Sequence, residues 1–169
     1  MLLGAGAVTH LVHHTPIPDP RLTPLQAFPG GSDPPLLLSR NALAVPRVRV
    51  VPELIPYTGE QGFMRAVLAG PEDLFLHAAL VDRQDVGTLP LRGGGAGTAA
   101  LLEDAGSRLK IRVNGAGGYL VIADSFVPGW SAVEDGRPVP IVRADYAFRA
   151  VPVSPGTHEV VLTYHPWSP

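Results

Sequence analysis

Two aspartates, Asp124 and Asp135, come nearest to a pair of residues that could carry acid–base chemistry. Glycoside hydrolysis uses two carboxyl groups about 5–9.5 Å apart. Asp135, however, precedes Gly136, and Asp-Gly is a preferred dipeptide for a two-residue hairpin turn. Asp124 lies in an apolar segment, where it needs a partner such as Arg143 or Arg149. We therefore predict structural roles for both aspartates and no catalytic residue in the chain.

Three histidines, His10, His13 and His14, raise the question of a metal site. In an extended segment, His10 and His14 share one face and His13 takes the other, so the rings cannot converge without a bend. We expect polar positions on an edge strand, with no metal and no other cofactor. The chain has no Cys, which excludes thiolate ligands, disulfides and a cysteine nucleophile.

Motifs for nucleotide binding and for serine hydrolases are also missing. Gly4-Ala5-Gly6 has Thr9 where a dinucleotide loop needs its third glycine, and Gly93–Gly97 lacks the Gly-Lys-Ser/Thr ending of a phosphate loop. No G-x-S-x-G elbow occurs, so the sequence gives no support for a serine hydrolase.

The composition indicates a globular domain with a near-neutral charge. The 169 residues are 46% hydrophobic and carry a formal net charge of -2. Lys110 is the only lysine among 13 basic residues, and the arginines are scattered singly, as expected of solvated strand faces. This pattern gives no electrostatic footprint for nucleic acid. No apolar run reaches the roughly 18 residues of a membrane helix, so we expect the chain not to reach a membrane unaided.

The elements that must position these residues are mainly strands. We predict a single soluble domain over 1–169, with an irregular, proline-rich lead-in at 1–35, mixed strands plus a short helix at 36–104, and antiparallel strands at 105–166. The helix is predicted at Glu60–Leu68, where apolar residues recur at i, i+4 spacing and Gly70-Pro71 follows. The 19 prolines and 19 glycines separate short apolar runs, which is typical of many turns.

Five alternating strands are predicted after residue 105. Turns are expected at Gly115–Gly118, at Asp135-Gly136 and at Ser154-Pro155-Gly156, and the last strand is His158–Tyr164. This spacing predicts a mainly β fold: an antiparallel β-sandwich, jelly-roll-like, with one short helix. Pro128 and Gly129 lead into the predicted strand Trp130–Glu134, and we expect Trp130 to be largely buried at the strand start as a core anchor, with a sugar-stacking platform as the alternative.

The segment Tyr119–Trp130, followed by Val133–Gly136, resembles the "apolar strand, Pro-Gly-Trp, Asp-Gly" passage of the YfhO family of bacterial membrane proteins. Ile141–Val151 and Pro155–Pro166 continue the resemblance in the same order, and Leu37–Arg47 is similar to the family's "Asn-x-x-x-x-Pro-Arg" strand start. The residues that carry the motifs are Pro128, Gly129, Trp130, Asp135, Gly136, Pro155, Gly156 and Tyr164.

The resemblance implies the C-terminal, extracytoplasmic domain of a membrane protein. Such proteins resemble GT-C-like glycosyltransferases that use polyprenyl-phosphate sugars and modify cell-surface polymers, with their catalytic acid in loops between membrane helices. The implied partners are the membrane helices of the parent protein and a cell-surface glycan or glycopolymer. The implied role of this chain is a non-catalytic accessory domain.

Two rival functions stay open. The first is a carbohydrate-binding module, which exposed coplanar aromatic residues on one sheet face would favour. The second is a structural cap on the parent's membrane helices, without a ligand, which a broad apolar patch would favour. For any contact with a glycan, we predict Trp130, Arg143, Tyr146 and Arg149 as the binding residues.

Overall fold

A computed structural model describes residues 5–29, 35–87, 89–90 and 93–166. Strands hold 53% of the residues and helices 13%, which confirms the predicted mainly β class, consistent with a β-sandwich. The chain divides into two compact units, an N-terminal unit (Met1–Pro46) and a C-terminal unit (Arg47–Pro169). The single-domain assignment made from the sequence stays a prediction.

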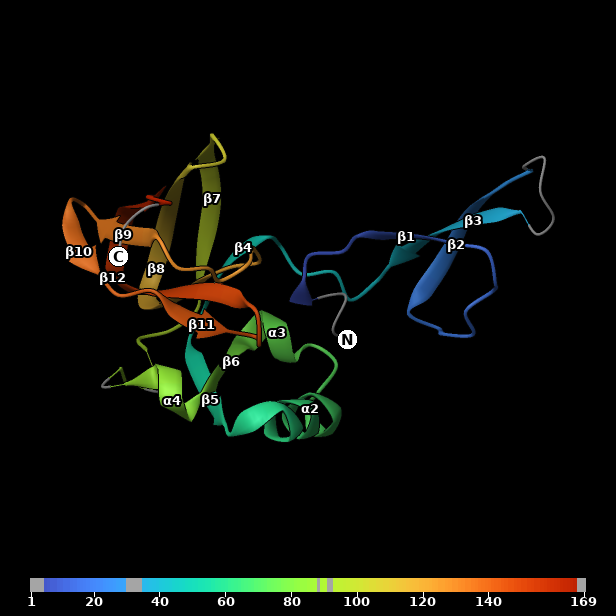
Figure 1. The fold of residues 1–169 in the computed structure, drawn as a ribbon, viewed down its shortest axis with the longest axis horizontal. Helices are drawn as coiled ribbons and strands as arrows, with labels where there is room; N and C mark the ends of the chain where they lie inside the picture. Colours follow the sequence, from blue (N-terminus) through green and yellow to red (C-terminus); the bar gives the residue numbers. More distant parts are fainter. Residues whose placement is uncertain (1–4, 30–34, 88, 91–92, 167–169) are drawn as a thin grey trace. The chain divides into compact units, whose positions relative to one another are not determined.

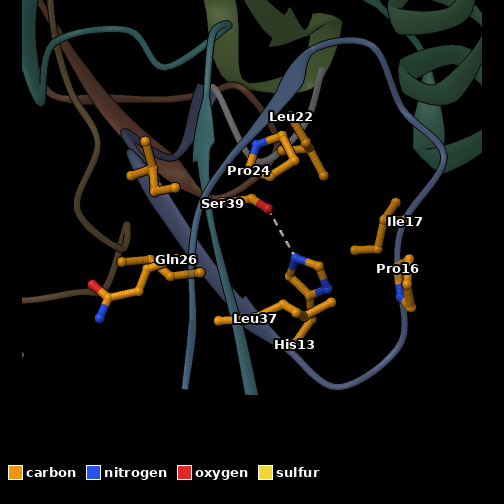
Figure 2. A pocket seen from close by; sticks show the side chains of 11 residues that line it. His13, Pro16, Ile17, Leu22, Pro24, Gln26, Leu37 and Ser39 are labelled. Atoms are coloured by element: carbon orange, nitrogen blue, oxygen red, sulfur yellow. Dashed lines mark hydrogen bonds between the residues drawn. The ribbon is translucent and has the colours of Figure 1, made fainter. Parts of the chain in front are cut away.

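The N-terminal unit contains a three-stranded antiparallel sheet in the order β1-β3-β2. Its strands are β1 (His10–His13), β2 (Leu22–Phe28) and β3 (Leu36–Asn41). The sequence predicted 1–35 as an irregular lead-in, and β2 corrects this. A proline is tolerated here because β2 is an edge strand with a bulge between Pro24 and Gln26. A pocket lies on this sheet, beside a hydrogen bond between His13 and Ser39 (Figure 2).

The C-terminal unit is built on a nine-stranded sheet (Figure 1). Its main path runs β4-β7-β8-β12-β11-β6-β5, while β9 pairs with β12 and with β10. All pairings are antiparallel except β5 with β6, which are parallel. The strands are β4 (Val48–Val51), β5 (Glu53–Tyr57), β6 (Ala78–Asp82), β7 (Gly97–Asp104), β8 (Arg108–Ile122), β9 (Trp130–Glu134), β10 (Arg137–Val139), β11 (Val142–Ala144) and β12 (Phe148–Tyr164).

Two of the predicted turns lie inside long strands instead. Gly115–Gly118 belongs to β8, and Ser154-Pro155-Gly156 belongs to β12, where Gly156 pairs with Gly115. Glycine is needed in β8 because neighbouring backbone comes very close: a Cβ on Gly115 would lie 2.7 Å from the Cα of Gly97. The glycines therefore allow close strand packing and continuous pairing, and they do not reverse the chain.

The predicted Asp135-Gly136 turn is confirmed. It joins β9 to β10, and Arg137 pairs with Glu134, so the loop has two residues. Asp135 has φ 48° and Gly136 has φ 81°. Positive φ at both central residues is the type I′ geometry, which matches the right-handed twist of paired strands.

The predicted helix forms as α2 (Gly59–Ala69), which buries Phe63 and Val67. Two further helices of one turn each, α3 (Leu74–His77) and α4 (Arg83–Val86), add to the single predicted helix. No helix in the part of the chain that the structure describes is long and apolar enough to span a membrane.

The core of the C-terminal unit lies on both faces of β8 and β12. Leu120 and Ile122 of β8 belong to one buried cluster with Val151, whereas Tyr119 and Val121 belong to another. Strand residues alternate between the two faces of a sheet, so a strand that is buried on both faces must be apolar throughout. This explains the unbroken apolar run at the end of β8, directly before Asp124.

Candidate functional site

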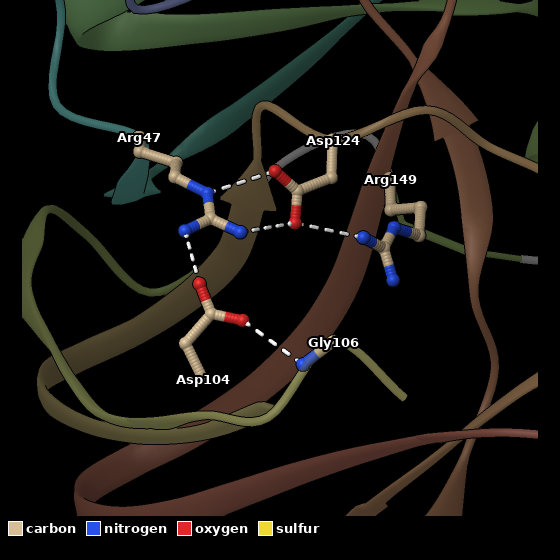
Figure 3. A network of polar contacts seen from close by, with 5 residues as sticks. All are labelled: Arg47, Asp104, Gly106, Asp124 and Arg149. Atoms are coloured by element: carbon tan, nitrogen blue, oxygen red, sulfur yellow. Dashed lines mark hydrogen bonds and ion pairs between the residues drawn. The ribbon is translucent and has the colours of Figure 1, made fainter. Parts of the chain in front are cut away.

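An arginine–aspartate network surrounds the end of β8 (Figure 3). The Asp124 carboxylate accepts hydrogen bonds from Arg47 Nε at 2.8 Å, from Arg47 Nη2 at 3.0 Å and from Arg149 Nη2 at 2.9 Å. Strand register brings these side chains together, because Ile122 of β8 pairs with Val48 on one side and with Arg149 on the other. The network therefore ties the start of β4 and the start of β12 to the end of β8.

Asp104, at the end of β7, extends the network. Its Oδ2 accepts a hydrogen bond from Arg47 Nη1 at 2.6 Å, and its Oδ1 accepts one from the Gly106 N–H at 3.4 Å. The bond from Arg47 lowers the pKa of Asp104, and the bonds to Asp124 and Asp104 raise the pKa of Arg47. Two guanidinium groups thus face two carboxylates, which balances the formal charge.

Arg149 stacks on Trp130. The carbon at the centre of its guanidinium lies 4.1 Å from the centroid of the indole ring, a cation–π arrangement. Arg149 is only 2% exposed, and this burial lowers the pKa of its guanidinium. Its Nε and Nη1 have no hydrogen-bond partner among the described residues. The indole ring also contacts Tyr164, with ring centroids 5.3 Å apart.

Trp130 begins β9, as predicted, and packs against the core. It is partly buried, whereas the sequence predicted that it is largely buried. A guanidinium covers one ring face in place of the apolar side chains of a core.

The other two predicted binding residues, Arg143 and Tyr146, have different partners. Arg143 pairs in register with Arg149, but its Nε donates a hydrogen bond to Asp85 at 2.9 Å. Tyr146 is 48% exposed, has φ 75°, and packs against Phe63 with ring centroids 5.2 Å apart and the ring planes tilted by 38°. A positive φ is unusual for an aromatic residue. Glycan binding by the four predicted residues stays a prediction.

A second ion pair, between Arg49 and Asp145, is buried. Arg49 Nη2 lies 2.5 Å from Asp145 Oδ2, and the Leu80 N–H donates to Asp145 Oδ1 at 2.8 Å. Burial raises the pKa of Asp145 to about 6. The sequence does not predict this pair, because Arg49 alternates with valines and so resembles a solvated position. The assignment of the arginines to solvated faces is wrong for Arg49 and Arg149, which are 6% and 2% exposed.

The Asp135 carboxylate fixes the β9–β10 hairpin to β12. One oxygen accepts the Glu159 N–H at 2.9 Å, and the other lies 2.7 Å from His158 Nδ1. The remaining ring nitrogen of His158 lies 2.9 Å from the Pro155 carbonyl oxygen. The bond from the Glu159 N–H, followed by that from His158, lowers the pKa of Asp135. Asp135, followed by Pro155, raises the pKa of His158.

These contacts define what the candidate residues can do chemically. Asp124 has Arg149 as a partner, as predicted, whereas the alternative partner Arg143 binds Asp85.

Of the three N-terminal histidines, His13 bonds to Ser39 and to the Thr15 carbonyl. No group of three or more metal-ligating side chains is found within residues 5–29, 35–87, 89–90 and 93–166.

The fold and these polar contacts define a β-rich domain in which charged side chains connect neighbouring strands. Residues 100–168 match the family model described as "Bacterial membrane protein YfhO". This part of the chain is a YfhO-family domain, as the sequence motifs predicted. No curated protein and no solved structure matched the chain.

Proposed function

We propose that this chain is a non-catalytic, extracytoplasmic accessory domain of a YfhO-like membrane protein. In this proposal the parent protein is a glycosyltransferase that uses polyprenyl-phosphate sugars and acts on cell-surface polymers. The family match supports the association with a membrane protein. The observation that carries the non-catalytic role is the occupancy of the Asp124 carboxylate, which accepts three hydrogen bonds from two arginines.

A general base must lie within about 3 Å of the proton that it removes, or one water away. For a sugar hydroxyl to reach Asp124, it has to displace Arg47 or Arg149 from that carboxylate. Displacing Arg149 is costly, because its guanidinium is buried and would lose the anionic partner that it has among the described residues. Asp135 is engaged by His158 and by the Glu159 N–H in the same way. Both aspartates therefore have structural partners that oppose a role in proton transfer.

Contact with a glycan fits Tyr146 better than Trp130. One face of the Trp130 ring lies against the Arg149 guanidinium, so a sugar cannot stack there. Tyr146 is 48% exposed, and its neighbour Asp145 is held by Arg49 and by the Leu80 N–H. The positive φ of Tyr146 is backbone strain that these contacts hold in place, and such strain is common at functional positions. This observation supports the alternative of a carbohydrate-binding module, with Tyr146 as its aromatic contact.

The test compares this chain with the full-length parent protein in lipid. Both are given a polyprenyl-phosphate sugar and cell-wall polymer, and transfer of the sugar is measured. We expect transfer by the parent and none by the chain alone. Transfer by the chain alone that is lost in Asp124→Asn, but kept in the surface control Asp73→Asn, would overturn the proposal. Titration of the chain with the polymer, comparing Tyr146→Ala with the native chain, tests the carbohydrate-binding alternative.

A further inference from the structure

The pocket of the N-terminal unit lies between the sheet and the loop that joins β1 to β2 (Figure 2). Its volume is about 280 Å³. Most of the lining is aliphatic, and the residues that define its walls are Pro16, Ile17, Leu22, Pro24 and Leu37. No Asp, Glu, Lys or Arg is among the described residues that line it. A pocket of this kind suits a neutral, largely apolar molecule.

Three polar side chains, His13, Gln26 and Ser39, belong to this lining. The Gln26 amide points away from the other two (Figure 2), and the hydrogen bonds of His13 and Ser39 fix where their protons are. His13 Nδ1 lies 2.8 Å from the Thr15 carbonyl oxygen, which can only accept. In a neutral imidazole, Nδ1 therefore carries the proton and Nε2 does not. His13 Nε2 lies 3.0 Å from Ser39 Oγ, so the serine hydroxyl donates to it.

This arrangement uses every polar hydrogen of the pair. The serine proton is bound to His13, and the His13 proton is bound to the backbone. What the pair still offers is the lone pairs of Ser39 Oγ, which can only accept a hydrogen bond. A carboxylate or another anion in the pocket would find no donor from these two side chains, whereas a hydroxyl group would find an acceptor.

We propose that this pocket binds a neutral aliphatic alcohol, with the ligand hydroxyl donating to Ser39 Oγ and the alkyl chain lying against Ile17 and Leu37. An apolar cavity of about 150 Å³ is large enough for benzene. The pocket is nearly twice that size. It therefore suits a ligand of roughly eight to eleven non-hydrogen atoms by the same scaling. The proposal depends only on the N-terminal unit and is independent of the function proposed for the parent protein.

The probes are 1-heptanol, its isomer 1-methoxyhexane and heptanoate, which differ in their polar groups and little in size. Each is titrated into the whole 169-residue chain at pH 8, and affinity is read from the NMR shifts of backbone amides at His13, Ile17 and Ser39. We expect the alcohol to bind about 3- to 10-fold more tightly than the ether, as one net hydrogen bond allows. Heptanoate is expected to bind more weakly than either.

Two variants separate the hydrogen bond from the apolar pocket. Ser39→Ala is expected to remove the preference for the alcohol while the ether binds as before. Ala27→Trp is expected to weaken both ligands, because Ala27 pairs in register with Leu37 and so shares its sheet face. Ser125→Ala, at an exposed position of the C-terminal unit, is the matched control and should change neither affinity.

Equal affinities for alcohol and ether would overturn the proposal, as would tighter binding of heptanoate or shifts that map outside the pocket. The amide spectrum of each variant first shows whether it is folded. If Ser39→Ala unfolds the sheet, the comparison of the three probes on the native chain and on Ala27→Trp still decides the outcome.

Discussion

The Asp124 carboxylate neutralises the guanidinium of Arg149, which is buried and not hydrated. Its substitution by Asn keeps the shape and removes the charge, so the buried Arg149 loses the anionic partner that it has among the described residues. Breaking a buried pair typically costs 3–5 kcal/mol, and solvent screening lowers this cost here because the Asp124 side chain is 22% exposed. We expect Asp124→Asn to lower the free energy of unfolding by about 2–3 kcal/mol in a denaturant titration. The exposed Asp73→Asn should change it little, and an unchanged midpoint for Asp124→Asn would contradict the structural role.

The His158–Asp135 contact predicts a window of pH in which the hairpin is held to β12. The folded-state pKa of His158 is raised, so its contribution to stability is full below about 6.5 and is lost as pH rises through the folded value. The pKa of Asp135 is lowered, so its contribution is present above 3.8 and is lost as pH falls through the folded value.

His158→Gln isolates this contribution. We expect the difference in melting temperature between the native chain and His158→Gln to be largest between about pH 4 and pH 6.5, and to shrink above it. A difference that does not change between pH 5 and pH 9 would show that the imidazole charge has no role. Other titrating groups, such as Asp145, are present in both proteins and therefore cancel in the difference.

Replacing a glycine by alanine should lower the free energy of unfolding at Gly97 in the sheet and raise it at Gly62 in the helix. A Cβ on Gly97 would lie 2.6 Å from the Asn114 carbonyl oxygen, so Gly97→Ala forces β7 and β8 apart. We expect a loss of about 1–3 kcal/mol in the free energy of unfolding. Gly62 lies inside α2, and its Cβ would meet Tyr57 at an ordinary 3.7 Å. Gly62→Ala should therefore gain about 0.5–1 kcal/mol from helix propensity. Equal effects of the two substitutions in thermal unfolding would contradict this account.

The elements that the sequence predicts best are those whose local signal is strong. Asp135-Gly136 forms the expected type I′ turn, and Glu60–Leu68 lies within α2, because turn chemistry and helical spacing are both local. The turn that the sequence predicts at the glycines of β8 is wrong, because these glycines accommodate backbone of β7 and β4, which are distant in sequence. Strand β7 lies within the predicted mixed strands of 36–104, but the sequence gives no bounds for it, since its residues are mostly exposed and give weak alternation.

The candidate site could be predicted only in part, for the same reason. The sequence showed that Asp124 needs a partner and offered Arg149, which is correct. It gave no sign of Arg47 or Asp104, because these join Asp124 through the pairing of β4 and β7 with β8. The Arg49–Asp145 pair was missed altogether: the residues are 96 positions apart, and neither stands out from the exposed charges around it.

At the scale of the whole molecule, the division into two units predicts that the C-terminal unit folds without the N-terminal one. Two of its buried clusters draw on β4 to β12, and none of the described residues in these two clusters precedes Val48. The arginine–aspartate network and the Arg49–Asp145 pair also lie wholly within it.

We expect a chain of residues 47–169 to unfold cooperatively and to give a β-type circular dichroism spectrum. Its melting temperature should lie within a few degrees of that of the 169-residue chain, as roughly equal stability implies. Limited proteolysis of the intact chain should correspondingly leave a resistant fragment that begins near Arg47. Loss of the cooperative transition in the shorter chain would show that the core needs contacts from Met1–Pro46.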